Sequence, residues 1–291
     1  MSPYAHITGW GMSVPQHILT NFDLAQRVDT TDEWIRERSG IRERRIADAG
    51  QSTATLAAEA ALNALRVANL NPADLDLIIV STSSPEHIFP ATACLVQDQI
   101  GAIKAGAFDL LAACTGFIYA LNMASQAIRS GSIQSALVIG AETLSRMVDW
   151  QDRNTCILFG DGAGAFVLQA SPEPGGLLSA VMRSDGSGAD LLSLPAGGSK
   201  MPASPETVKT GQHFIHMNGR EVFRFATRVM TQSTKDAVAQ ANLKIEDIHL
   251  VVPHQANSRI IEAAMRGLDI PHERCMINVE RYGNTSTASI P

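Results

Sequence analysis

The chain has 291 residues, of which 45% are hydrophobic and 18% charged, and its formal net charge is −6. This composition predicts a globular α/β protein with a sizeable core, and the negative charge argues against general nucleic-acid binding. It contains no apolar run of the roughly 18 residues that a membrane helix needs, no export signal at its start and no C-x-x-C pair, so we expect a cytoplasmic protein without a structural metal.

The first half of the chain alternates helical and apolar stretches. "TLAAEAALNALRV" at 55–67 has helical spacing and is followed by the apolar run 77–80. "GAFDLLAA" at 106–113 and "SALVIGAE" at 135–142 indicate buried strands. "TCILFGDGAGAFVLQA" at 155–170 is interpreted as two strands around a glycine-rich turn. Apolar runs this short are typical of sheets that are covered on both faces.

Two segments of the chain resemble each other. "ANLNPADLDLIIVSTSS" at 68–84 and "ANLKIEDIHLVVPHQAN" at 241–257 share Ala-Asn-Leu, an aspartate and a leucine at a spacing of 173 residues. Each follows a helical stretch and contains an apolar run, so we expect a strand at 250–252. Duplication would give two similar halves, at 1–170 and 171–291, with an active site between equivalent strand ends. Chance reuse of one α/β pattern is the alternative.

The second half is the shorter one. The segment 171–207 is rich in Gly, Pro and Ser and predicts a surface excursion between the halves. The chain stops at "GNTSTASIP", where a proline among small residues is typical of a helix start. We therefore expect the C-terminal part of the fold to be truncated.

Cys114 lies where a strand is predicted to turn into a helix. "FDLLAAC" ends the strand, and the residues after Cys114 have helical spacing up to Gly131. The free N–H groups and the dipole of a helix N-terminus lower the pKa of a thiol, which makes Cys114 a candidate nucleophile. A buried structural cysteine is the alternative, and Cys94, Cys156 and Cys275 are assigned to that class.

His254 and Asn284 are the candidate partners of Cys114. The repeat places His254 at the position equivalent to 81, at a strand end, and Asn284 three residues before the equivalent of Cys114. The three side chains can therefore converge between the halves. A core histidine and a turn asparagine are the alternatives if they do not.

Two further patterns admit alternative explanations. Gly160, Gly162 and Ala165 match a dinucleotide-binding G-x-G-x-x-A, but "AFVLQA" predicts a strand where that motif needs a helix. Arg220, Arg224 and Arg228 recur at helical spacing, and "WIRERSGIRERR" adds five arginines at 34–45. Such stripes are either solvated faces or sites for phosphate or an acidic partner.

Together these stretches resemble the ketoacyl-acyl-carrier-protein synthase III enzymes. The matching stretches are "TNFDLAQRVDTTDEWIRERSGIRERRIA", "FDLLAACTGFIYAL", "DRNTCILFGDGAGA", "MNGREVF", "VVPHQAN" and "YGNTSTASIP". The resemblance implies the duplicated, five-layered αβαβα thiolase-like fold and a homodimer. It also implies that acyl-CoA, most simply acetyl-CoA, acylates Cys114, and that malonyl-acyl carrier protein is then decarboxylated and condensed with the acyl group. No cofactor is implied beyond the CoA thioester.

The resemblance also assigns roles to individual residues. Cys114 would be the nucleophile, and His254 and Asn284 would stabilise the enolate. The second oxyanion N–H would come from a glycine-rich loop beyond Pro291. The remaining residues are listed by role: CoA binding, Trp34, Arg38, Arg153, Gly219, Phe223, Ala256 and Asn257; the acyl pocket, Leu144, Phe159, Leu192 and Ile215, with Phe89 reaching across from the partner; carrier-protein docking, Arg224, Arg228 and Arg259.

Three other functions stay open at this point. The first is a paralogous acyltransferase of secondary metabolism that uses the same Cys114. The second is a dinucleotide-dependent oxidoreductase built on Gly160 and Gly162. The third is a non-catalytic binding subunit.

Overall fold

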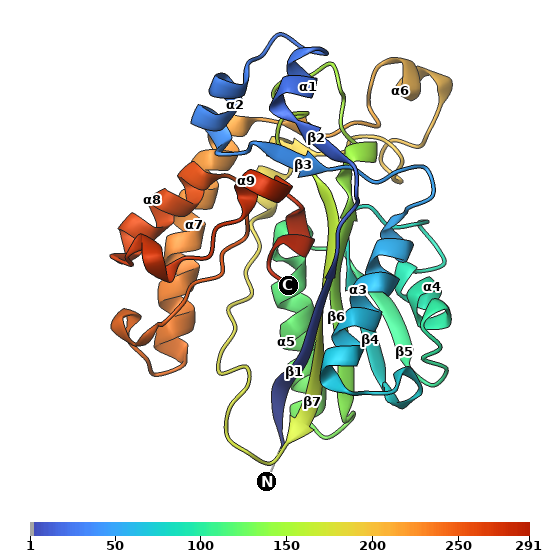
Figure 1. Ribbon diagram of the computed structural model, residues 1–291, viewed down its shortest axis with the longest axis vertical. Coiled ribbons are helices and arrows are strands. Elements are labelled where there is room, and N and C mark those ends of the chain that lie inside the picture. The colour runs from blue at the N-terminus through green and yellow to red at the C-terminus, as the bar shows by residue number, and fades with distance from the viewer. Residues whose placement is uncertain (1–2) are drawn as a thin grey trace.

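The computed structural model describes residues 3–291, and its centre is a five-stranded sheet of order β1-β7-β6-β4-β5 (Figure 1). The strand β4 is parallel to β5 and β6, whereas β7 is antiparallel to both β6 and β1. The strands are β1 (Tyr4–Ser13), β4 (Leu77–Ser81), β5 (Gly106–Leu110), β6 (Ser135–Thr143) and β7 (Asp161–Ser171).

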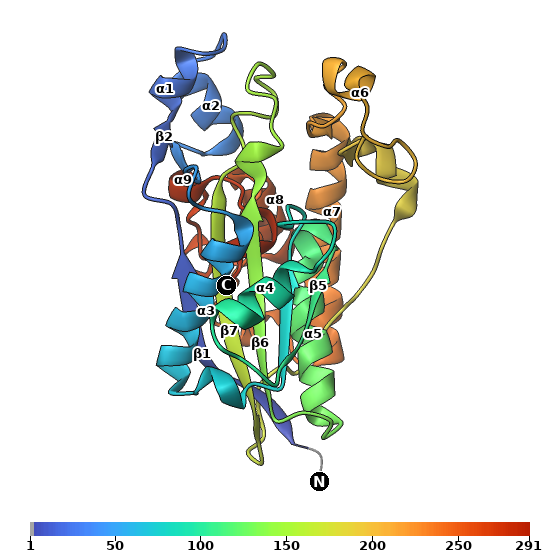
Figure 2. The same ribbon diagram turned by 90° about the vertical axis from the view of Figure 1, so that its right-hand side faces the viewer.

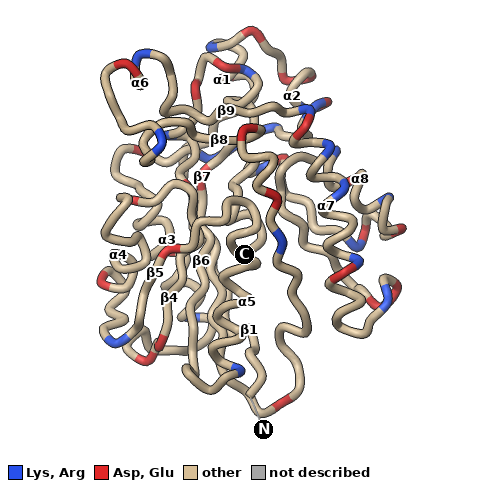
Figure 3. Tube along the Cα trace, turned by 180° about the vertical axis from the view of Figure 1, so that it is seen from behind, with Lys and Arg blue, Asp and Glu red and all other residues tan. Residues whose placement is uncertain are grey.

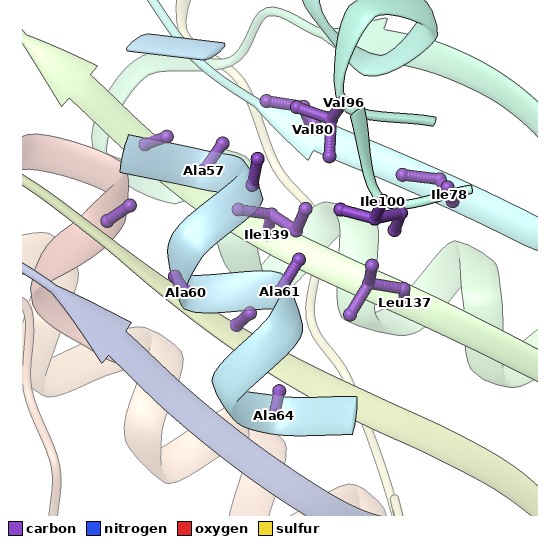
Figure 4. Close-up of a cluster of buried hydrophobic side chains, with 14 of the residues drawn as sticks. Ala57, Ala60, Ala61, Ala64, Ile78, Val80, Val96, Ile100, Leu137 and Ile139 are labelled. Carbon is purple, nitrogen blue, oxygen red and sulfur yellow. The ribbon is translucent and has the colours of Figure 1, made fainter. Parts of the chain in front are cut away.

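Helices cover both faces of this sheet. The helices α3 (Thr53–Ala68) and α4 (Thr92–Gln99) lie on one face and α5 (Gly116–Arg129) on the other (Figure 1). The buried face of α3 is made of alanines, which pack on branched side chains of β4 and β6 and on α4 (Figure 4). Small side chains let the helix lie close to the sheet. A Cβ on Gly9 of β1 would come within 2.3 Å of the backbone oxygen of Ala64.

Beyond α5 lies the second half of the chain. Its long helix α7 (Gly219–Gln240) runs alongside α5 (Figure 2) and packs on α8 (Ser258–Leu268). The extended segment 177–183 lies between α5 and α7. Tyr119 of α5 and the backbone of Arg183 share hydrogen bonds, and Ser179 Oγ donates to Ala237 O of α7 at 2.6 Å.

The strand expected at 250–252 is not a full strand. Within residues 3–291 its backbone pairs through the single bridge between Val251 and Cys275. The side chains of Leu250 and Val252 are 56% and 42% exposed, because neither sheet neighbours nor a helix cover them on that side. The second sheet of the predicted five layers is therefore represented by extended segments rather than by a hydrogen-bonded ladder.

Short elements form the end of the molecule above the sheet in Figure 1 and bring distant parts of the chain together. The pair β2 (Ile18–Thr20) and β3 (Glu43–Arg45) is antiparallel, as is the pair β8 (Leu192–Ser193) and β9 (His216–Met217). The short helices are α1 (Asn21–Ala25), α2 (Asp32–Ser39), α6 (Pro205–Lys209) and α9 (Val279–Tyr282).

The backbone repeats at the spacing found in the sequence. Each copy has a one-turn 3₁₀ helix, Pro72–Asp74 and Ile245–Asp247, preceded by an asparagine in the left-handed region, with φ of 51° at Asn69 and 57° at Asn242. Left-handed conformations also recur at Ala113 and Ser286, with φ of 45° and 46°. Duplication explains this better than chance reuse of a pattern. The division of the chain at residue 170 stays a prediction.

Two expectations about strands are wrong. Residues 155–170 do not form two strands around a turn: 155–159 are turns, and the glycines Gly162 and Gly164 lie inside the single strand β7. No helix follows them, so the dinucleotide motif is absent. The strand β5 is not buried but forms one edge of the sheet, which leaves Leu111, just after it, 76% exposed.

The glycines near the end of the sheet make room for the C-terminal segment 282–291. A Cβ on Gly140 of β6 would lie 2.3 Å from Thr287 O, and one on Gly164 would lie 2.6 Å from the backbone of Pro291. The glycine-rich pattern thus allows one stretch of backbone to pack directly on another.

We expect Gly140→Ala to lower the free energy of unfolding by about 1–3 kcal/mol, because a backbone carbonyl would have to move out of a packed core. Urea denaturation measures the change. Gly186→Ala is the control, since its Cβ would meet nothing within 4 Å. Equal stability of the two variants would show that 282–291 does not pack on β6 as described.

Candidate active site

Cys114 lies at the junction of β5 and α5, as predicted. A single 3₁₀ turn, Ala113–Thr115, joins the strand to the helix, and Ala113 has a φ of 45°. This sharp turn places the half-buried Cys114 at the N-terminal end of α5. There the unpaired N–H groups of the first turn stabilise a negative charge on sulfur.

Two residues of the second half act on the Cys114 thiol. Ser286 Oγ donates to Cys114 Sγ at 3.9 Å. Burial alone would raise the pKa of Cys114, but the charge of nearby His254 and the hydroxyl of Ser286 outweigh it and hold the pKa below its ordinary value. The thiolate, which is the nucleophilic form, is therefore favoured.

His254 presents one ring nitrogen to the site and anchors the other. Its Nδ1 lies 2.7 Å from Ser289 Oγ, whereas its Nε2 is buried and has no hydrogen-bond partner within residues 3–291. Burial would lower the pKa of His254, but the charge of Cys114 and the backbone of Ser286 outweigh it and raise the pKa. The imidazole and the thiol thus stabilise each other's charged forms.

Asn284 is held with its amide donor free. It is 8% exposed, and its backbone bonds to the segment 158–160, with Asn284 N donating to Leu158 O at 2.8 Å and Gly160 N donating to Asn284 O at 3.1 Å. Ser286 N donates to Asn284 Oδ1 at 2.8 Å. Because this bond fixes which amide atom is the oxygen, Nδ2 is left to donate to a ligand.

The structure therefore brings together the three residues singled out in the sequence. Ser286 touches both Cys114 and Asn284, and Ser289, which contacts His254, donates to Ser286 O at 2.9 Å. The site lies between the two halves, at the carboxyl end of β5. The roles assigned to these residues stay predictions.

Sequence reasoning missed Glu142, a buried carboxylate at the end of β6. It accepts hydrogen bonds from Ser84 Oγ at 2.6 Å and from the backbone N–H groups of Ser83 and Ser84. Burial raises its pKa to about 7 despite these bonds, and its charge acts against that of the Cys114 thiolate. The sequence "GAET" contains no pattern that distinguishes it from an ordinary surface glutamate.

A second missed pair is the counterpart of Cys114 and His254 in the repeat. Thr287, equivalent to Cys114, donates to Oγ of Ser81, equivalent to His254, at 2.8 Å. Both hydroxyls crowd the start of α5, where a Cβ on Gly116 would lie 2.0 Å from Ser81 Oγ. The spacing of 173 residues was the signal that could have found this pair.

The predicted CoA-binding residues gather at the entrance side of the site. The guanidinium groups of Arg38 and Arg153 lie 4.3 and 5.1 Å from the ring centroid of Trp34. Asn257 Nδ2 donates to Arg38 O at 2.9 Å, which ties the start of α8 to α2. Phe223, near the start of α7, packs under Arg259 at 5.6 Å. Gly219 begins α7, and Ala256 directly precedes Asn257.

Only part of the predicted acyl pocket comes together. Leu144 and Phe159 are buried in one apolar cluster, and Ile215 packs against it. Leu192 lies outside this cluster on β8 and is 40% exposed. Phe89 is 84% exposed in the loop before α4 and does not reach the cluster within its own chain.

The predicted docking arginines lie on the surface of α7 and α8. Arg224, Arg228 and Arg259 are exposed, and Arg224 pairs with Glu221 at 3.1 Å on the same helix. Basic and acidic side chains alternate over these helices (Figure 3). Surface pairs of this kind contribute little energy, so the arginines remain available to a partner.

Two searches of the described residues found no candidate feature. No helix in residues 3–291 is long and apolar enough to cross a membrane. The same residues hold no cluster of three or more His, Cys, Asp or Glu side chains placed to bind a metal ion.

Comparison with known proteins identifies the family. The model of 3-oxoacyl-[acyl-carrier-protein] synthase III matches residues 108–186, and the model of the C-terminal part of that enzyme matches 238–291. A beta-ketoacyl-[acyl-carrier-protein] synthase III of Roseiflexus sp. (strain RS-1) is 52% identical over 100% of this chain and 88% of the relative. The chain belongs to the 3-oxoacyl-[acyl-carrier-protein] synthase III family.

Other members of the synthase III family agree in sequence and in fold. The one from Symbiobacterium thermophilum is 55% identical over 98% of this chain and 86% of that relative. The crystal structure of the Aquifex aeolicus VF5 enzyme is 48% identical, covers 99% of this chain and 88% of its own, and superposes with a TM-score of 0.90. The predicted thiolase-like α/β fold class is thereby confirmed.

Proposed function

We propose that this chain is the condensing enzyme that initiates type II fatty acid synthesis. It joins the acyl group of an acyl-CoA to the two-carbon unit of malonyl-acyl carrier protein and releases CoA and CO2. Membership of the synthase III family supports this reaction. The single observation that carries it is the convergence of Cys114, His254 and Asn284 on one site between the two halves.

In the first half-reaction the Cys114 thiolate attacks the thioester carbonyl of acyl-CoA. The carbon–sulfur bond to CoA breaks, CoA leaves as a thiolate, and the acyl group stays on Cys114. The helix N-terminus and His254 lower the cost of forming the thiolate, which is the species that reacts.

In the second half-reaction malonyl-acyl carrier protein loses CO2, and negative charge develops on its thioester oxygen. Asn284 Nδ2 and His254 Nε2 are the two polar atoms of the site left without partners that oppose this role. Hydrogen bonds from both atoms stabilise the enolate. Its carbon then attacks acyl-Cys114, which gives the 3-oxoacyl carrier protein and frees the Cys114 thiolate.

The substrates approach from the side of α2, α7 and α8. Trp34 offers an aromatic face to the adenine of CoA, and Arg38 and Arg153 supply positive charge for its phosphates. The exposed arginines Arg224 and Arg228 of α7, with Arg259 of α8, suit an acidic carrier protein. We place this chemistry in the cytoplasm.

A homodimer completes the acyl pocket in this proposal. The edge strand β5 has no partner beyond β4, and Leu111 beside it and Phe89 are 76% and 84% exposed. Exposed edges and apolar side chains of this kind are covered in stable proteins. A second copy at this edge would bring its Phe89 toward the pocket that Leu144 and Phe159 line.

Light scattering should therefore give about twice the chain mass of 31.1 kDa. Leu111→Arg should yield the monomer, because it places a charge in the centre of the covered patch. Leu62→Arg, on the partly exposed face of α3, is the control and should leave the dimer intact. A wild-type monomer would contradict the dimer.

The test of the reaction is a panel of acyl-CoAs of increasing length, each mixed with malonyl-acyl carrier protein and the enzyme. We expect 3-oxoacyl carrier protein to form, fastest with a short primer such as acetyl-CoA. Mass spectrometry of the carrier protein measures the product. Acyl transfer to an alcohol or another small acceptor, without condensation, would favour the paralogous enzyme of secondary metabolism instead.

A further inference from the structure

Ser289 connects His254 to the backbone around the site. Its Oγ lies 2.7 Å from His254 Nδ1, donates to Ser286 O at 2.9 Å, and accepts from Gln255 N at 3.2 Å. Ser289 ends the 3₁₀ turn Ser286–Ser289 that carries Ser286 against Cys114.

The number of protons on Ser289 decides what it can do for His254. A serine hydroxyl has one proton and two lone pairs. The proton is used toward Ser286 O, and one lone pair is used by Gln255 N. The remaining lone pair faces His254 Nδ1, so this nitrogen must carry the hydrogen that completes the set.

We propose that Ser289 is a positioning residue that keeps the proton of His254 on Nδ1, so that Nε2 is always the nitrogen that exchanges a proton with Cys114. The mechanistic consequence rests on the proposed function, but the hydrogen-bond arrangement does not. Ser289 plays the part of the third residue that orients the base in other nucleophile–base pairs.

This arrangement keeps the proton count balanced through the reaction. The Cys114 proton moves to Nε2, which gives a thiolate beside an imidazolium with both nitrogens protonated. The thiolate takes the acyl group, and CoA leaves as a thiolate that takes a proton from water. The imidazolium then donates Nε2–H to the developing enolate. Condensation restores the Cys114 thiolate beside the same imidazolium, so the Nδ1 proton never has to move.

The charges around the pair are compatible with this cycle. The thiolate of Cys114 and the backbone of Ser286 raise the pKa of His254. Glu142, from the end of β6, is the other titratable group that acts on the pair, and its charge opposes the thiolate. The hydrogen bonds from Ser83 and Ser84 keep the Glu142 carboxylate directed toward the loop 82–84.

The test compares the whole 291-residue chain with Ser289→Ala and Ser289→Thr, each labelled with ¹⁵N-histidine. The His254 signals are identified as those lost in His254→Asn. We expect Nδ1 to be protonated throughout the titration in the wild type and in Ser289→Thr, which keeps the hydroxyl. In Ser289→Ala a share of neutral His254 should carry its proton on Nε2 instead.

Acylation kinetics give the second readout. With acetyl-CoA, Ser289→Ala should lower kcat for acylation of Cys114 by about tenfold or more at nearly unchanged KM, and Ser289→Thr should restore it. Ser130→Ala is the matched control, because Ser130 Oγ also donates to the carbonyl three residues before it, at 2.9 Å, but at the exposed end of α5.

The proposal and the proposed function fail in different ways. If Nδ1 stays protonated in Ser289→Ala, or if Ser289→Thr behaves like Ser289→Ala, then Ser289 does not set the tautomer. If the wild type shows the expected ¹⁵N signals but no condensation with malonyl-acyl carrier protein, then Ser289 acts as proposed and the assigned reaction is wrong.

Discussion

Cys114→Ala should lose condensation by a factor of at least about 10³, because the enzyme then has no atom to carry the acyl group between the two half-reactions. Sulfur is the only part removed, and the sharp turn at Ala113 is kept. Folding should therefore be unaffected, and formation of 3-oxoacyl carrier protein from acetyl-CoA measures the loss. The variant also removes the negative charge that raises the pKa of His254.

Cys275→Ala is the matched control for this prediction. Cys275 is also partly accessible, but burial raises its pKa, so its thiol is the unreactive kind. We expect this variant to condense at the wild-type rate. Substantial condensation by Cys114→Ala, or its loss in Cys275→Ala, would mean that the acyl group is carried elsewhere.

Asn284→Asp should slow condensation by about 10²–10³-fold while leaving acylation of Cys114 nearly unchanged. Aspartate keeps the oxygen that accepts from Ser286 N at 2.8 Å, so the local backbone is preserved. It replaces the free Nδ2 donor with a second oxygen and places negative charge where the enolate forms. Separate assays of acetyl-CoA acylation and of malonyl-acyl carrier protein condensation measure the two effects.

Asn71→Asp is the control for the asparagine. Asn71 Oδ1 also accepts from the backbone N–H two residues on, Ala73 N at 3.1 Å, but it caps an exposed 3₁₀ helix far from Cys114. This variant should match the wild type in both assays. If Asn284→Asp lost both half-reactions equally, Asn284 would support the site's structure rather than the second step.

The reactive part of the site could be predicted from the sequence because of the repeat. Cys114 stands out as a small residue between a strand and a helix, and the spacing of 173 residues relates its position to the stretch that holds Asn284. The same spacing places His254 at the end of an apolar run. These three positions are defined by chain direction and turn geometry, which local patterns record.

Glu142 and Ser289 could not be found in this way. Serines and glutamates occur throughout the chain, and what distinguishes these two is burial and contact with residues far away in sequence. The position of β5 at the sheet edge depends on strand order, which no single run of residues encodes. The glycines of β7 suggested a turn because their packing partners lie more than a hundred residues later, in 282–291.

The central claim is that Cys114 carries the acyl group between two substrates, and intact-mass spectrometry of the wild-type chain tests it most directly. Mixing with acetyl-CoA should add one acetyl group, located on the peptide that contains Cys114. Adding malonyl-acyl carrier protein should remove that group and produce an equal amount of 3-oxoacyl carrier protein. An acetyl group on another residue, or one that malonyl-acyl carrier protein does not discharge, would contradict the account.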